Sequence, residues 1–238
     1  MNILVVGAGG AIGRAVTDAF CQRYSSAVVY AVSRRAYTGA KPKQVVPVQL
    51  DTGNEQAIHD WLSACKAEGT AFTHVVCTTG VLHDSNVVPE KRLEDVSASA
   101  MQHYFTVNTL VPALWVKLLV NHLVQGPSSL TVLSARVGSI SDNQLGGWYG
   151  YRTSKAALNM FVKTAAVEYA RRAKHTSLIC YHPGTVDSAL SKPFQRNVKP
   201  EKLFTPAYTA SQLLQIIEHS NPTESPYFID WAGKSISW

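Results

Sequence analysis

The chain has 238 residues, and a hydrophobic content of 46% is enough to bury a full core in one domain spanning residues 1–238. No apolar run reaches the ~18 residues that suggest a membrane span. The four cysteines are scattered without a C-x-x-C pair, which does not argue for a disulfide framework and favours reduced thiols in a cytoplasmic protein. The formal charge of +6 suits an anionic ligand, although a solvated basic surface explains it equally well.

Short β-rich runs alternate with longer helical patterns along the chain. Strands are predicted at 2–7, 27–33, 45–50, 73–78, 129–134, 176–182 and 227–231. Helices are predicted near 11–24, 54–67, 98–125, 152–173 and 206–219. This alternation indicates parallel strands with helical crossovers, hence a doubly wound α/β sheet covered on both faces. The stretch near 185–205 is the least regular, and a loop that long is more often functional than idle.

The first predicted strand runs into the glycine-rich turn Gly-Ala-Gly-Gly-Ala-Ile-Gly at residues 7–13, and a helix follows. Such a turn lets the backbone approach a pyrophosphate while the helix N-terminus points at it. The usual G-x-G-x-x-G does not fit, because Ile12 occupies the third glycine position. An ordinary turn between strand and helix is the alternative. The nucleotide-binding residues predicted here are Gly7, Gly9, Gly10, Ala11, Ile12 and Gly13.

The end of the second predicted strand is where an adenosine ribose is expected. An NAD site usually has an Asp or Glu there, but no acid lies between Asp18 and Asp51. The strand ends in Ser33 and Arg34 instead, and a guanidinium offers a bidentate fork to a 2′-phosphate. This favours NADP over NAD, unless the arginine is simply solvated. Asp51 either accepts from the adenine amino group or caps the helix that follows it.

Residues 151–155 read Tyr-Arg-Thr-Ser-Lys, which places Tyr151 and Lys155 on one face of a predicted helix. An ammonium group beside a phenol favours the tyrosinate, so the phenol can exchange a proton nearer neutral pH. Many solvated helix faces carry the same spacing by chance. Beside a dinucleotide site the pair indicates catalysis more strongly, because hydride chemistry needs both a nicotinamide and a proton donor.

With these motifs, the chain resembles the short-chain dehydrogenase/reductase family, and more narrowly its branch of C-factor and sniffer-type carbonyl reductases. Residues 7–13 fit the family's G-x-x-x-G-x-G with Ala11 at the middle glycine. Further resemblance lies in residues 80–84, 89–93, 138–143, 151–155 and 230–238. The resemblance implies a single Rossmann domain whose seven parallel strands have the order 3-2-1-4-5-6-7. It also implies NADPH-dependent reduction of a ketone or aldehyde, a small-molecule carbonyl substrate.

The family's catalytic set is Asn, Ser, Tyr and Lys. Asn108 matches the Asn, which in the family holds a proton-relaying water; a solvent-facing helical Asn is the alternative. Tyr151 would be the general acid in reduction, and Lys155 would lower its pKa and bind the nicotinamide ribose. Further cofactor contacts implied by the resemblance are Thr79, Gly80, Pro183, Gly184, Val186 and Ser188. Relatives pair through the helices near 98–125 and 152–173, so a homodimer is one expected state and a monomer the other.

The catalytic serine is ambiguous. The family's serine follows the fifth strand, often as the second of a Ser-Ser pair, but here the pair reads Ser134-Ala135. Ser139 lies near the common family spacing to Tyr151 and is slightly favoured over Ser134.

Two further features leave alternatives open. Trp148 and Tyr149 either line the pocket, favouring an apolar or aromatic carbonyl, or serve in packing. The family's Asn-Asn-Ala-Gly is Cys-Thr-Thr-Gly at residues 77–80. This departure and the altered serine pair keep a second function in view, a low-turnover signalling or regulatory protein that binds a dinucleotide. No His spacing indicates a metal site, and no basic-aromatic stripe indicates nucleic-acid binding.

Overall fold

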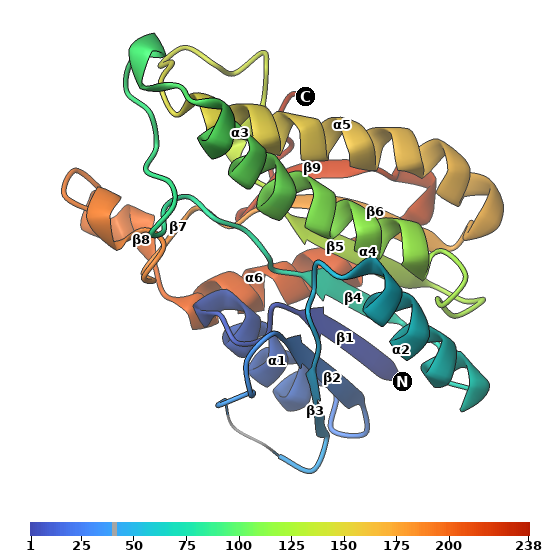
Figure 1. Ribbon diagram of the computed structural model, residues 1–238. Coiled ribbons are helices and arrows are strands. Elements are labelled where there is room, and N and C mark those ends of the chain that lie inside the picture. The colour runs from blue at the N-terminus through green and yellow to red at the C-terminus, as the bar shows by residue number, and fades with distance from the viewer. Residues whose placement is uncertain (40–41) are drawn as a thin grey trace.

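A parallel sheet of seven strands forms the centre of the computed structural model, which describes residues 1–39 and 42–238 (Figure 1). The strands are β1 (Asn2–Val6), β2 (Val28–Ser33), β3 (Val45–Gln49), β4 (His74–Cys77), β5 (Ser128–Leu133), β6 (Thr176–His182) and β9 (Tyr227–Asp230). Each lies within one residue of its predicted bounds. The spatial order is β3-β2-β1-β4-β5-β6-β9, and all neighbours run parallel. Since β9 is the last strand of this sheet, the predicted order is confirmed.

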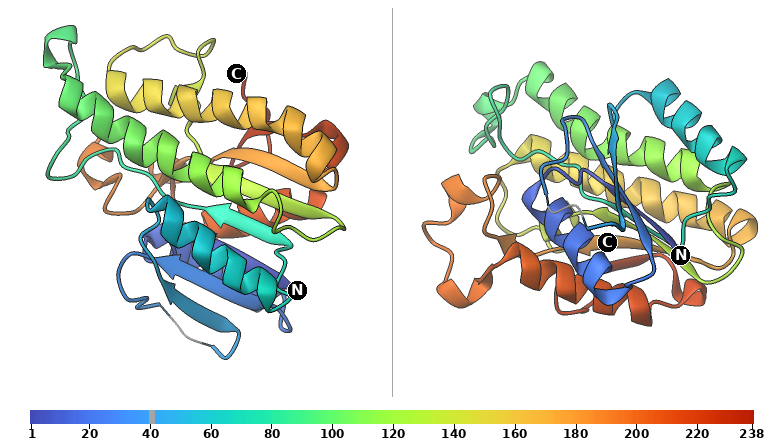
Figure 2. Two further views of the ribbon diagram at one scale, coloured as in Figure 1. Left: turned by 45° about the vertical axis from the view of Figure 1, so that its right-hand side comes forward. Right: turned by 90° about the horizontal axis from the view of Figure 1, so that it is seen from below.

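Helices cover both faces of the sheet, as Figure 2 shows. They are α1 (Ala11–Arg23), α2 (Glu55–Ala67), α3 (Ala98–Phe105), α4 (Val111–Leu119), α5 (Tyr149–Arg172) and α6 (Pro206–His219). Helices α1 and α6 lie on one face, and α2, α4 and α5 lie on the other. In the part of the chain that the structure describes, no helix is long and apolar enough to cross a bilayer.

The alternation of side chains along β1 builds the two buried layers. Ile3 and Val5 pack with Phe20 of α1 on one face. Leu4 packs with Leu158 of α5 on the other. Because both faces are covered, a ligand can reach the sheet only at an edge, and in such folds it binds outside the carboxyl ends of the strands.

The prediction of a single helix at 98–125 is wrong. A π-helical turn at Thr106–Leu110 separates α3 from α4, and α4 ends at Leu119. Pro112 has no N–H to donate to the carbonyl of Asn108, four residues earlier, so the α-helical pattern cannot continue through this point. A π-turn accommodates the interruption, and such turns are frequent at functional sites.

The stretch near 185–205 is only partly irregular. Strands β7 (Thr185–Val186) and β8 (Leu203–Phe204) pair in parallel and form a second, two-stranded sheet. Single 3-10 turns at Lys192–Phe194 and Pro200–Lys202 lie between them. These two-residue strands carry too little periodicity to be predicted from sequence.

Candidate active site

A cavity of about 390 Å³ lies beyond the carboxyl ends of β4, β5 and β6. It brings together many of the predicted site residues from distant parts of the chain. Those lining it are Ile12, Thr79, Gly80, Ser134, Tyr151, Lys155, Pro183, Gly184, Val186 and Ser188. A larger groove of about 830 Å³ lies between α1 and α6, but its walls carry none of the predicted catalytic side chains. The smaller cavity is therefore the candidate active site.

The first turns of α5 carry Tyr151 and Lys155. Lys155 is 2% exposed, and its Nζ donates to the carbonyl of Leu133 at 2.8 Å and lies 5.9 Å from the Tyr151 ring centroid. Burial lowers the pKa of Lys155 to about 8. Burial also raises the pKa of Tyr151 to about 12, against the expectation that the lysine lowers it. Desolvation of the phenolate is the cause of this rise.

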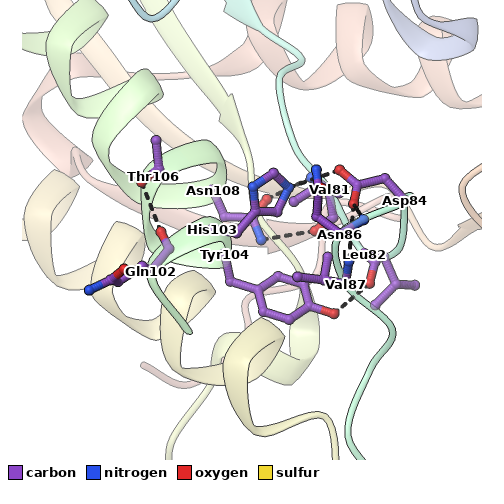
Figure 3. A network of polar contacts seen from close by, with 10 residues as sticks. All are labelled: Val81, Leu82, Asp84, Asn86, Val87, Gln102, His103, Tyr104, Thr106 and Asn108. Carbon is purple, nitrogen blue, oxygen red and sulfur yellow. Dashed lines mark hydrogen bonds and ion pairs between the residues drawn. The ribbon is translucent and has the colours of Figure 1, made fainter. Parts of the chain in front are cut away.

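Asn108 is fully buried, which excludes a solvent-facing side chain. Figure 3 shows its amide bonded to the backbone of Val81, accepting from N at 2.7 Å and donating to O at 2.9 Å. The amide also donates to Ser154 Oγ at 3.1 Å. Beside it, the Tyr104 hydroxyl donates to the carbonyl of Leu82 at 2.7 Å (Figure 3). The π-turn is thus joined both to the segment after β4 and to α5.

Gly80 lies between Asn108 and Lys155. A Cβ at position 80 would be 3.4 Å from both Asn108 Oδ1 and Lys155 Nζ. Position 80 is thus in contact with both the amine and the amide, at a distance where a Cβ would just fit.

The glycine-rich turn presents open backbone to a ligand. Gly7 has φ +82°, and Gly9 and Gly10 are exposed. A Cβ at Gly13 would lie 2.3 Å from the carbonyl of Gly7, so only glycine permits this packing. Helix α1 begins with no side-chain cap and no acidic residue in its first turn. Its N–H groups are thus available to an anion such as a pyrophosphate.

The end of β2 adjoins this turn, since a Cβ at Gly9 would lie 3.5 Å from Ser33 Cβ. The Ser33 hydroxyl donates to the carbonyl of Arg35 at 2.7 Å. Arg34 is exposed and forms no ion pair with any residue in the described ranges. Asp51 accepts from Gly53 N at 3.1 Å; the cap of α2 is Asn54. The helix-cap alternative for Asp51 is therefore wrong.

The segment after β6 turns sharply beside the cavity. Gly184 has φ +73°, and a Cβ there would lie 2.6 Å from the Phe204 ring, so a side chain would be both strained and obstructed. Val186 pairs with Phe204 in the small sheet, and its carbonyl accepts from Ser191 Oγ at 2.5 Å. These contacts hold the backbone of β7 against the cavity.

Comparisons with known proteins agree with this geometry. Residues 1–199 match the model of the short chain dehydrogenases. The chain belongs to this family. The C-signal of Myxococcus xanthus is 31% identical over 147 residues, which cover 61% of this chain and 83% of the C-signal. The predicted resemblance to the C-factor branch is confirmed by this relative.

Solved structures of the family have the same fold. The carbonyl reductase Sniffer of D. melanogaster superposes with a TM-score of 0.85 at 18% identity, covering 100% of this chain and 99% of Sniffer. A short-chain dehydrogenase/reductase of Burkholderia multivorans, solved with bound NADP, gives a TM-score of 0.84 at 22% identity with the same coverage.

The two candidate serines of this short-chain dehydrogenase occupy different environments. Ser134 lines the cavity, but its hydroxyl donates to Asn159 Oδ1 at 2.6 Å. Ser139 is 2% exposed, accepts from Asp142 N at 3.1 Å and does not line the cavity. Ala135 lines it instead. The geometry therefore does not support the sequence preference for Ser139.

Aromatic side chains form the outer wall of the cavity. Trp148 lies 6.1 Å from the Tyr151 ring and 5.2 Å from the Phe194 ring, centroid to centroid. The ring of His83 lies 5.6 Å from Phe194. Trp148 and Phe194 line the cavity, whereas Tyr149 does not.

Among the cavity-wall residues that sequence reasoning missed are Phe194 and His182. His182 directly precedes the predicted Pro183, so its place in the sequence was a usable signal. Phe194 lies in the stretch whose conformation no local pattern indicates. Across residues 1–39 and 42–238, no group of three or more His, Cys, Asp or Glu side chains is arranged to hold a metal.

Proposed function

We propose that this short-chain dehydrogenase reduces a ketone or aldehyde with NADPH and that Tyr151 protonates the carbonyl oxygen. The observation that carries the proposal is the meeting of Tyr151 and the buried amine of Lys155 in one cavity. That cavity also contains Ile12 from the N-terminal turn of α1, so a dinucleotide bound at the turn can extend into it.

The residues present fit NADP. The uncapped N-terminus of α1 and the exposed Gly9 and Gly10 would hold the pyrophosphate. Arg34, exposed and unpaired in the described ranges, would hold the 2′-phosphate. When bound, NADPH supplies the hydride that the carbonyl carbon accepts.

Tyr151 suits the acid step. Its hydroxyl has no hydrogen-bond partner among the described residues, so it is available to a substrate oxygen. The raised pKa keeps the phenol protonated at neutral pH until charge develops on that oxygen. Lys155 then faces the phenolate that remains and favours it electrostatically.

The substrate is proposed to carry an apolar or aromatic group beside the carbonyl. Trp148, Phe194 and Leu190 line the cavity, and rings at the 5–6 Å separations seen here favour edge or offset contacts with another ring.

A second candidate is a low-turnover signalling protein that binds NADP. It is favoured by Ala135 in the cavity and by the engaged hydroxyl of Ser134, which leave one expected donor missing. The name of the C-signal relative points the same way.

The deciding experiment measures NADPH oxidation by the purified protein over matched aromatic and aliphatic ketones and aldehydes. We expect turnover with aromatic carbonyls, loss of turnover in Tyr151→Phe, and unchanged NADPH affinity in that variant. Tyr149→Phe is the control, because Tyr149 lies two residues away and outside the cavity. Absence of turnover with every carbonyl, with NADPH bound, would favour the signalling role.

A further inference from the structure

A carbonyl oxygen that accepts from Tyr151 retains a second lone pair, and a second donor would stabilise the charge that develops there. The hydroxyls near Tyr151 do not provide it. Ser134 donates to Asn159, Ser139 lies outside the cavity, and Ala135 has no donor.

Most other hydroxyls of the cavity wall have partners; that of Thr185, on the segment proposed to meet the cofactor, has none among the described residues. Thr78 Oγ1 donates to the carbonyls of Val6 and Gly7 at 2.9 and 3.1 Å. Thr79 Oγ1 lies 3.1 Å from Cys77 Sγ. Ser191 donates to Val186, as described above, and Ser188 belongs to the segment proposed to meet the cofactor.

His182 is the last residue of β6, and it lines the cavity together with Tyr151. Alternate residues of a strand share a face, so His182 points to the same side as Cys180. Cys180 packs in the cluster that contains Leu158 and Val162 of α5. The imidazole therefore projects toward the helix that carries Tyr151.

The neighbouring strand places His182 beside the serine position. Tyr181 is paired with Leu133 in the parallel register, and Ser134 N donates to the carbonyl of Tyr181 at 2.8 Å. One residue further along both strands, His182 adjoins Ser134 and Ala135 at the cavity edge.

Neither ring nitrogen of His182 hydrogen-bonds to a described residue, and Nδ1 is buried without a partner. Buried polar atoms of native proteins are nearly always paired, so His182 lacks the contacts that usually fix a buried histidine. Because Nδ1 is enclosed, Nε2 is the nitrogen that a ligand in the cavity can reach.

The charged groups around His182 form ion pairs and hydrogen bonds with other residues. Arg136 pairs with Asp142 at 3.4 Å and with Asp230 at 3.2 Å. Asp230 Oδ1 also accepts from the backbone of Ala232 and Lys234. Burial lowers the pKa of His182 to about 4, so the ring is neutral at pH 7 and carries one N–H.

From this placement we propose that His182 donates a hydrogen bond from Nε2 to the substrate carbonyl oxygen, opposite Tyr151. The inference rests on the proposed carbonyl reduction. The carbonyl carbon gains hydride, the oxygen takes the Tyr151 proton, and His182 keeps its own proton throughout. A neutral imidazole polarises the carbonyl without bringing a second cation beside Lys155.

The test compares His182→Ala and His182→Gln with His122→Ala. His122 also has a buried, unpartnered Nδ1 but lies outside the cavity, so its loss reports the structural cost alone. We expect His182→Ala to lower kcat by ~10²–10³, with NADPH affinity and thermal midpoint matching those of His122→Ala. His182→Gln retains an N–H donor and should recover part of the loss. Ala135→Ser in the His182→Ala background should also restore activity by supplying a hydroxyl.

NMR titration of the protein with ¹⁵N-labelled histidines gives a readout that needs no cofactor. The signal of His182 is assigned by its absence in His182→Gln. The His182 ring should remain neutral above pH ~5. A ring that becomes charged near its ordinary pKa overturns the proposal, as does a wild-type kcat in His182→Ala. Weakened NADPH binding at unchanged kcat would assign His182 to the cofactor instead. If the wild-type protein reduces no carbonyl, the proposed function fails and the His182 role fails with it.

Discussion

Glu90 caps the helix that carries the proposed proton donor, because its Oε2 accepts from Gly150 N at 3.1 Å. Its backbone carbonyl accepts from Trp148 N at 2.6 Å, and α5 has no cap from a side chain of its own. Glu90 is 4% exposed and comes from a loop 60 residues earlier in the chain. The cap satisfies one of the N–H groups that a helix N-terminus leaves unpaired.

Glu90→Ala is expected to lower the free energy of unfolding by about 1–2 kcal/mol, the usual cost of losing a helix cap. Chemical denaturation measures this directly. Glu94→Ala is the matched control, because Glu94 is exposed. Equal stabilities of the two variants would show that the carboxylate does not support α5.

Arg34→Ala is expected to weaken NADPH binding about 10- to 100-fold, since charge-assisted hydrogen bonds contribute roughly 1.5–3 kcal/mol. NADH affinity should change little, because NADH has no 2′-phosphate. Fluorescence titration with both cofactors measures the contrast. Arg35→Ala serves as the control, since Arg35 is its exposed neighbour. Equal losses for both cofactors would count against the 2′-phosphate contact.

The buried Lys155 predicts a pH-dependent stability. Its pKa falls from 10.5 to about 8 on folding, so the unfolded chain binds more protons between these values. Stability contributed by this group therefore rises with pH across that window, by roughly 3 kcal/mol. Urea unfolding at several pH values should show this rise in the wild type and its absence in Lys155→Met. Identical pH profiles would mean that the ammonium is solvated in the folded protein.

The serine environments predict that neither hydroxyl is the main carbonyl donor. Ser134→Ala leaves Asn159 Oδ1 without its donor, and the expected loss of stability is about 1–3 kcal/mol. Ser139→Ala removes the acceptor for Asp142 N and a 3.4 Å contact with Ser141 Oγ. In both variants the loss of kcat should be far smaller than the ~10²–10³-fold loss typical of a missing transition-state donor. A loss of that size in Ser139→Ala alone would restore the preference drawn from sequence spacing.

The sequence by itself determined the sheet and the nucleotide end, because both depend on local signals. Strand and helix periodicities, the glycine turn at residues 7–13 and the four-residue spacing of Tyr151 and Lys155 are all written within short segments. The parallel order then follows from the family that these motifs identify.

Only the tertiary structure decided how the polar side chains point. The Ser134 hydroxyl is directed to Asn159 on α5, and the Asn108 amide to the backbone of Val81. Glu90 reaches α5 across 60 residues, and His182 enters the cavity because its strand packs beside β5. These orientations depend on partners far apart in the chain, and a buried polar group takes the direction in which its hydrogen bonds are satisfied.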